Sequence, residues 1–89
     1  MKLKEGTIIT KNDEEYIIVA AGEAGKIFSG IIRLNGTAAY IAELMKEEMS
    51  EKQLVEGLLR KYEVTEDIAI MSVSEVVEKL FSVGLIEKQ

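Results

Sequence analysis

Residues 27–45 read IFSGIIRLNGTAAYIAELM, and the spacing of their apolar side chains changes at Asn35. Before Asn35, isoleucine, phenylalanine and leucine crowd a short run, which predicts a β-strand over residues 27–34. Gly30 interrupts this run and predicts a bulge or a close approach of the backbone. From Asn35, a good helix N-cap, the spacing becomes that of a helix. Its predicted buried face comprises Ala38, Ile41, Ala42 and Met45.

Two more strands precede this stretch. Residues 7–10 and 16–19 are rich in β-branched and aromatic side chains. Residues 11–14 between them contain Asn and Asp, which tolerate positive φ and therefore favour a hairpin turn. Residues 21–26 predict a loop of small residues. This loop is not a phosphate cradle, because Ile27 stands where such a motif needs Ser or Thr, and Ala20 stands where it needs its first Gly.

Two further helices follow the first. Ser50 and Gln53 have the spacing of a capping box, which predicts the start of the second helix. Thr65 suits the N-cap of the third helix, and Gly84 suits the position after its end. Residues 85–87 predict a short extended tail. The whole pattern predicts a single domain over residues 1–89 of the α+β class: a three-stranded antiparallel sheet followed by three helices, winged-helix-like in plan.

The composition excludes several classes of chemistry. The 89 residues include no His and no Cys, so the common nucleophile–base pairs and most transition-metal sites are unavailable. The sixteen Asp and Glu fall mostly on the polar sides of helical patterns. We therefore predict a protein that is not an enzyme and holds no metal and no cofactor. Residues 1–5 lack the apolar segment of a secretory signal, and residues 17–21 form too short an apolar run to cross a membrane, which predicts a cytoplasmic protein with no membrane partner.

The distribution of charge bears on nucleic acid as a partner. The formal net charge is −5, and residues 35–89 carry six Lys and Arg against eleven Asp and Glu, whereas residues 1–34 carry five of each. Winged-helix proteins present helices to DNA, and affinity for DNA comes largely from basic side chains that neutralise phosphates. The acidic helical half would be repelled, so we predict no nucleic-acid partner.

Two segments have more apolar surface than a core alone requires. In the third strand, isoleucines fall on both alternate faces. In the third helix, the apolar arc spans about 160°, against the roughly 100° that suffices to face a core. Both excesses could pack against the first helix and the loops. Alternatively, the third strand and the third helix lie close together and line an apolar groove beside an open sheet edge, where an extended peptide could add as another strand.

Three stretches in order resemble the PqqD-like family. Residues 33–44 (RLNGTAAYIAEL) are similar to its Leu-Asn-x-Thr-Ala/Gly…Ile-Trp-x-Leu signature. Residues 50–64 (SEKQLVEGLLRKYEV) and 76–86 (VVEKLFSVGLI) resemble its second helix and its end. Ala42 stands at the usual Trp position, and the glycine that often follows the first helix is missing from residues 46–49. These departures concern core packing more than the expected role.

The resemblance implies a function. Proteins of this family bind the leader segment of a precursor peptide, as an added strand beside the third strand, and present it to a modifying enzyme, often a radical S-adenosylmethionine protein. Carried onto this chain, the resemblance and the pattern give the expected peptide-binding residues: Ile27, Phe28, Ser29, Gly30, Ile31, Ile32, Arg33, Ile70, Val77 and Phe81. The alternative is a winged-helix-like interaction or regulatory protein whose open edge joins a homodimer and which has no peptide substrate.

The charge argument gives the first testable prediction. We expect no specific binding of double-stranded DNA, because the helical half is acidic. An anisotropy titration with labelled DNA at low salt checks this. Tight binding that weakens steeply as salt is added would show that the charge argument is wrong.

Overall fold

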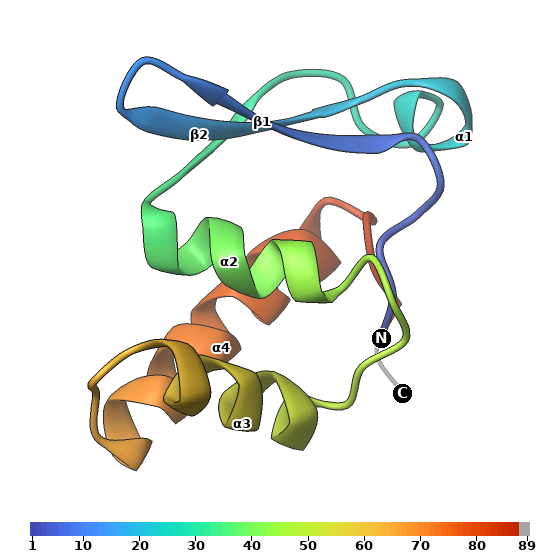
Figure 1. Cartoon of the computed structure of the whole chain (residues 1–89). Coiled ribbons are helices and arrows are strands. Elements are labelled where there is room, and N and C mark those ends of the chain that lie inside the picture. The colour runs from blue at the N-terminus through green and yellow to red at the C-terminus, as the bar shows by residue number, and fades with distance from the viewer. Residues whose placement is uncertain (88–89) are drawn as a thin grey trace.

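The strands form one antiparallel sheet in the order β1-β2-β3, and the three long helices lie on one side of it (Figure 1). The computed structural model describes residues 1–87. Its elements are, in chain order, β1 (Thr7–Asn12), β2 (Glu15–Ala20), α1 (Gly22–Gly25), β3 (Ile32–Leu34), α2 (Gly36–Leu44), α3 (Glu51–Lys61) and α4 (Glu66–Ser82). The predicted fold class, a three-stranded antiparallel sheet followed by helices, is confirmed.

The β1–β2 hairpin has the predicted turn. Asn12 pairs with Glu15, so two residues connect the strands. The first of them, Asp13, has a φ of 58°. This left-handed conformation is one that Asp and Asn adopt more readily than most other residues, which explains why the chain turns here.

The predicted third strand is wrong in its extent. Only residues 32–34 pair with β2, whereas residues 27–31 form no ladder with it. The amides of Ile27 and Phe28 instead donate to the carbonyl of Ala24, at 3.1 and 3.0 Å, and so continue the turn that follows α1. Gly30 then has a φ of 136°, outside the range of a regular strand. The predicted loop over residues 21–26 likewise contains the short helix α1.

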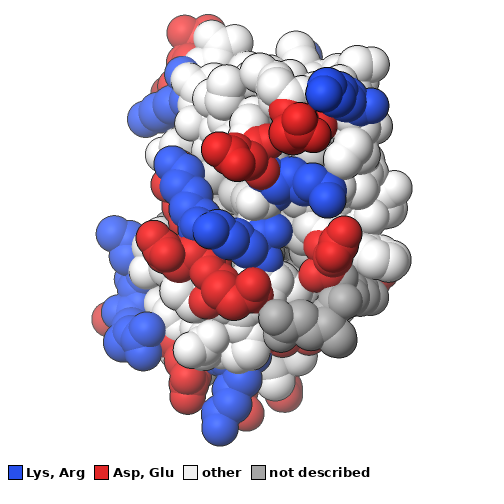
Figure 2. Space-filling model, turned by 90° about the vertical axis from the view of Figure 1, so that its right-hand side faces the viewer, with Lys and Arg blue, Asp and Glu red and all other residues white. Residues whose placement is uncertain are grey.

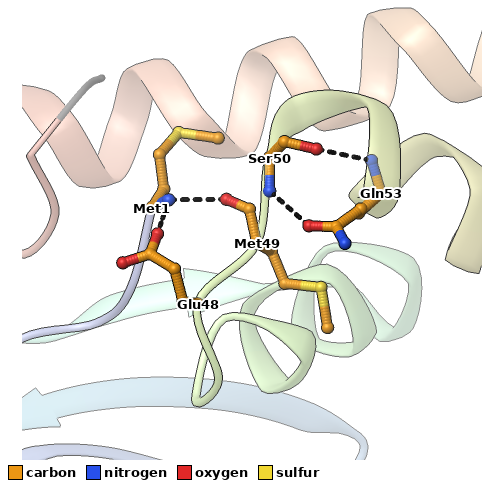
Figure 3. Close-up of polar contacts among 5 residues, drawn as sticks. All are labelled: Met1, Glu48, Met49, Ser50 and Gln53. Carbon is orange, nitrogen blue, oxygen red and sulfur yellow. Dashed lines mark hydrogen bonds and ion pairs between the residues drawn. The ribbon is translucent and has the colours of Figure 1, made fainter.

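Side-chain caps begin the three long helices at the predicted residues. The side chain of Asn35 accepts a hydrogen bond from the Ala38 amide at 2.8 Å. Ser50 and Gln53 form the predicted capping box, in which each side chain accepts from the other residue's amide (Figure 3). Thr65 caps α4. Gly84 has a φ of 81° just beyond the end of α4, which confirms its predicted place.

Residues 1–4 form hydrogen bonds with two other parts of the chain, the segment after α2 and the segment after α4. The Met1 amino group donates to the Glu48 carboxylate and to the Met49 carbonyl, beside the start of α3 (Figure 3). The Leu3 amide donates to the Met45 carbonyl, and the Lys4 amide donates to the Leu85 carbonyl, both at 2.8 Å. The tail that was predicted to be extended is instead a bend over residues 85–86, whose side chains are buried.

α2 is the central element. It contacts all three strands on one side and both α3 and α4 on the other, between the two layers seen in Figure 1. Its buried face includes Ile41, Ala42 and Met45, as predicted, but Ala39 replaces Ala38, which is only partly buried. Because α2 is covered on two sides, its buried arc is wider than one set of helical spacings predicts.

Charged side chains lie on the surface. On the face seen in Figure 2, acidic and basic groups are interspersed and no area of a single sign dominates. The ion pair between Lys46 and Glu43 (3.0 Å) joins two exposed groups, and such pairs add little stability. None of the helices in residues 1–87 has both the length and the apolar content needed to cross a membrane.

The core gives the second prediction. Ile41, Leu58 and Leu80 have no exposed surface, so truncating any one to Ala should cost about 2–5 kcal/mol of unfolding free energy. Leu34 is only partly buried, so its truncation to Ala should cost less unfolding free energy. Chemical denaturation followed by circular dichroism measures each value.

The matched control is Ile68→Ala. Ile68 also lies on a helix but is 49% exposed, so this change should cost about 0.5 kcal/mol or less. Equal losses at Ile68 and Leu80 would contradict the assignment of the buried faces.

Candidate functional site

β3 is an edge strand. The sheet order leaves it β2 as its one neighbour, with Ile17 opposite Arg33 and Ile18 opposite Ile32. The backbone N–H and C=O groups on the outer side of an edge strand remain available to another chain. The expectation that the strand over residues 27–34 lies at a sheet edge is confirmed for residues 32–34.

The run that leads into β3 carries more unpaired backbone. Within residues 1–87, the amides of Ser29, Gly30 and Ile31 donate no hydrogen bond to another backbone group. All three residues are exposed, so water can satisfy these amides. Residues 29–31 and the outer side of β3 therefore offer backbone donors and acceptors that another strand could use.

Side-chain burial alternates along this stretch. Ile32 is 4% exposed, and Phe28 and Leu34 are partly buried against the core. Ile31 lies between them in sequence and is 59% exposed, and Arg33 is also exposed. The even-numbered side chains thus face the helices, and the predicted presence of isoleucine on both faces is confirmed.

One flank of α4 is apolar and exposed. Ile70 and Phe81 are 48% and 45% exposed, and both lie beside the buried face of this helix. Val77 lies between them along the same strip but is completely buried. Of the three α4 residues expected in the site, two are at the surface and the third supports them from the core.

The two ends of α4 lie near the two ends of the stretch formed by residues 27–35. A Cβ atom placed on Gly84 would lie 2.7 Å from Cγ2 of Ile27, so the chain after α4 touches the start of the segment. At the other end, Asn35 and Ile68 line one cavity of about 180 Å³. The segment and α4 therefore run in opposite directions. α2 also packs directly on β3.

The structure sorts the ten expected peptide-binding residues into two groups. Phe28, Ile32 and Val77 are buried or partly buried. The others are exposed: Ile27, Ser29, Gly30, Ile31, Arg33, Ile70 and Phe81. The Arg33 guanidinium lies 4.0 Å from the Glu15 carboxylate across the β2–β3 pair. Among residues 1–87, no three Asp or Glu side chains are grouped so that they could hold a metal ion.

Three exposed apolar residues were missed by the sequence analysis. Ile8 lies on β1, and Ile68 and Met71 lie on α4, each about half exposed. The signal for Ile8 was present, because strict alternation in β1 puts it on the face opposite Ile9. The two α4 residues had no such signal, since an apolar arc does not say which of its flanks a neighbouring helix covers.

Comparisons with known proteins identify a family and a shared fold. The model of the family described as Coenzyme PQQ synthesis protein D (PqqD) matches residues 13–86. The fold is similar to that of TbiB1 in complex with the TbiA(beta) leader peptide, with a TM-score of 0.74, 16% identity and coverage of 100% of this chain and 98% of that one. It is also similar to lasso peptide synthetase B1 complexed with the leader peptide, with a TM-score of 0.68, 23% identity and coverage of 94% and 93%. No curated protein matches the chain.

The contact between Gly84 and Ile27 gives the third prediction. Gly84→Ala adds a Cβ atom that Ile27 must move to accommodate. Gly22→Ala is the control, because Gly22 also has positive φ, 56°, but a Cβ atom there meets nothing within 4 Å. Both variants should lose about 1–2 kcal/mol of stability to backbone strain.

Only Gly84→Ala should shift the methyl resonances of Ile27 in a methyl-labelled NMR spectrum. If the Ile27 signals are the same in both variants, the end of α4 does not fix the position of this side chain.

Proposed function

The chain belongs to the PqqD family, and from this premise we propose that it is a binding protein that captures the leader segment of a precursor peptide. The two structurally similar proteins named above are described with leader peptides bound, and this chain covers nearly all of each. The proposed role is non-catalytic: the leader is held so that a separate enzyme can modify the rest of the precursor.

One observation carries the proposal. The stretch of residues 29–34 combines an open sheet edge with surface amides that have no backbone partner within the described chain. An extended peptide that adds to such an edge forms main-chain hydrogen bonds whatever its sequence. The short β3 would then lengthen toward Ser29, because the added strand supplies the partners that β2 does not.

Side chains supply the specificity. Ile27 and Ile31 on the strand segment, and Ile70 and Phe81 on α4, present apolar surface on the two sides of the proposed leader site. Leader side chains that alternate along an extended strand would bury part of this surface. The contribution of Phe28, Ile32 and Val77 is indirect. Their packing in the core fixes the positions of these exposed residues.

The proposed mechanism is tethering. A leader held at β3 keeps the remainder of the precursor close to a modifying enzyme, so the modification becomes effectively intramolecular. We propose that this enzyme is a separate partner, and a radical S-adenosylmethionine protein is the class that the family resemblance suggests. The acidic helical half disfavours nucleic acid as the ligand.

The fourth prediction tests strand addition. Ile31→Pro removes an amide that has no backbone acceptor in the described chain, so the fold should survive while leader binding is lost. Ile32→Pro should unfold the sheet, because Ile32 is buried and pairs with Ile18. Circular dichroism melts measure folding, and isothermal titration measures binding, with synthetic leaders of short precursor peptides sought among the neighbouring genes as ligands.

Two side-chain variants serve as controls. Ile31→Ala keeps the amide and should weaken binding only in part, and Phe81→Ala should do the same through α4. If Ile31→Pro stays folded and binds the leader as the unmodified chain does, strand addition at this edge is wrong. If the unmodified chain binds no precursor and sediments as a homodimer, the interaction-protein alternative replaces the proposal.

A further inference from the structure

The cavity that Asn35 and Ile68 share lies where β3 ends. Its lining comes from the first residues of α2, from α3 and the link that follows it, and from the first half of α4. β3 ends at Leu34 and Asn35 is the next residue, so the cavity is adjacent to the end of the open strand edge. We call it the α2–α4 cavity.

The buried part of the lining is apolar. Leu58 has no exposed surface and Val76 is 6% exposed, while Ala38 and Val64 are partly buried against the core. Ile68 also lines the cavity, but it is 49% exposed. An apolar group that entered the cavity would leave water and would cover part of Ile68, and both changes favour binding.

The polar part of the lining offers acceptors to a positive charge. Glu75 is the one charged residue among the described residues that line the cavity. Within residues 1–87 its carboxylate has no ion pair, not even with Lys79 four residues later on the same helix. Ser72 lies one helical turn before Glu75, and its hydroxyl has no hydrogen-bond partner in the same part of the chain. A cationic group at this side of the cavity would find an unpaired carboxylate and a hydroxyl.

The volume of the cavity limits the size of its occupant. The cavity measures about 180 Å³. Sites for drug-sized molecules and cofactors usually measure about 300–1,000 Å³. An engineered cavity of about 150 Å³ in another protein holds one benzene molecule. The α2–α4 cavity therefore has room for one large side chain and is too small for a nucleotide or a coenzyme.

A peptide added at β3 would bring a side chain to this cavity. The added strand lies about 4.8 Å from β3 and advances about 3.3 Å with each residue. One or two residues beyond the residue that faces Leu34, the peptide is level with Asn35, which lines the cavity. The end of the proposed leader site and the cavity are thus within one side chain's reach of each other.

We propose that the α2–α4 cavity is a specificity pocket that receives one lysine or arginine side chain of the leader. Both side chains combine an apolar stem with a charged end. The stem would contact Ile68 and Val76, and the charged end would pair with Glu75 and donate to Ser72. The surrounding helix favours the same sign, because residues 66–82 contain four Asp and Glu against one Lys. This inference rests on the proposed function, since the leader is the molecule that carries the side chain to the cavity.

The experiment exchanges the two charges of the proposed pair. The ligand is a synthetic leader of a short precursor peptide sought among the neighbouring genes, and each of its Lys and Arg residues is changed in turn to Glu. Glu75→Lys should weaken binding of the unchanged leader about tenfold in isothermal titration, and one of the changed leaders should recover most of that loss. Glu56→Lys is the control, because Glu56 is exposed on α3 and does not line the cavity, and it should produce no such exchange. If no changed leader recovers affinity for Glu75→Lys, the pocket does not hold a basic side chain.

A second pair of variants tests the volume. Ser72→Met fills the cavity and should lower leader affinity about tenfold, whereas Ser74→Met, at an exposed position of α4 outside the cavity, should leave it unchanged. Circular dichroism melts show whether each variant folds, and the charge exchange decides alone if Ser72→Met does not. Normal binding to folded Ser72→Met, or tight binding of a leader without Lys or Arg, would overturn the pocket and leave the proposed function standing. A chain that binds no leader would overturn both.

Discussion

The packing of α2 between the sheet and the other two helices is the contact on which the rest of the structure depends. α2 contacts β1, β2 and β3 on one side and α3 and α4 on the other. Small side chains make this possible: Ala39 and Ala42 are almost fully buried and let both layers approach the helix axis. Ala42 stands where the family usually has Trp, and a bulky ring at this completely buried position would force the layers apart.

Because α2 occupies the inner face of the sheet, the long helices cover neither the outer face nor the outer side of β3 (Figure 1). β3 is paired over only three residues, and the preceding run is held by the turn after α1 rather than by β2. The edge is thus attached firmly at Ile32, through burial, and more loosely before it. Such a segment can adjust to an added strand without disturbing the core.

Magnitudes indicate how a leader would be selected. Each main-chain hydrogen bond contributes a net of about 0.5–1.5 kcal/mol and is independent of sequence. Burying a large apolar side chain completely contributes about 1.5–3 kcal/mol and depends on its shape. Under the proposed function, discrimination between peptides would therefore rest on the exposed isoleucines and Phe81 rather than on the backbone. Apart from Glu75, the excess acidic charge of residues 35–89 would contribute little to this discrimination.

The sequence by itself determined the features that depend on neighbouring residues. The caps at Asn35, Ser50 and Thr65, the turn at Asp13 and the helix end at Gly84 each follow from local hydrogen bonding or from the φ that a residue tolerates. The order of strands and helices follows from the same signals. Only the tertiary structure decided that residues 27–31 leave the ladder, that Ala39 rather than Ala38 is buried, and that Val77 is buried while Ile70 and Phe81 are exposed. Those outcomes depend on how α2 and α4 are rotated against their neighbours, and packing between residues distant in sequence sets that rotation.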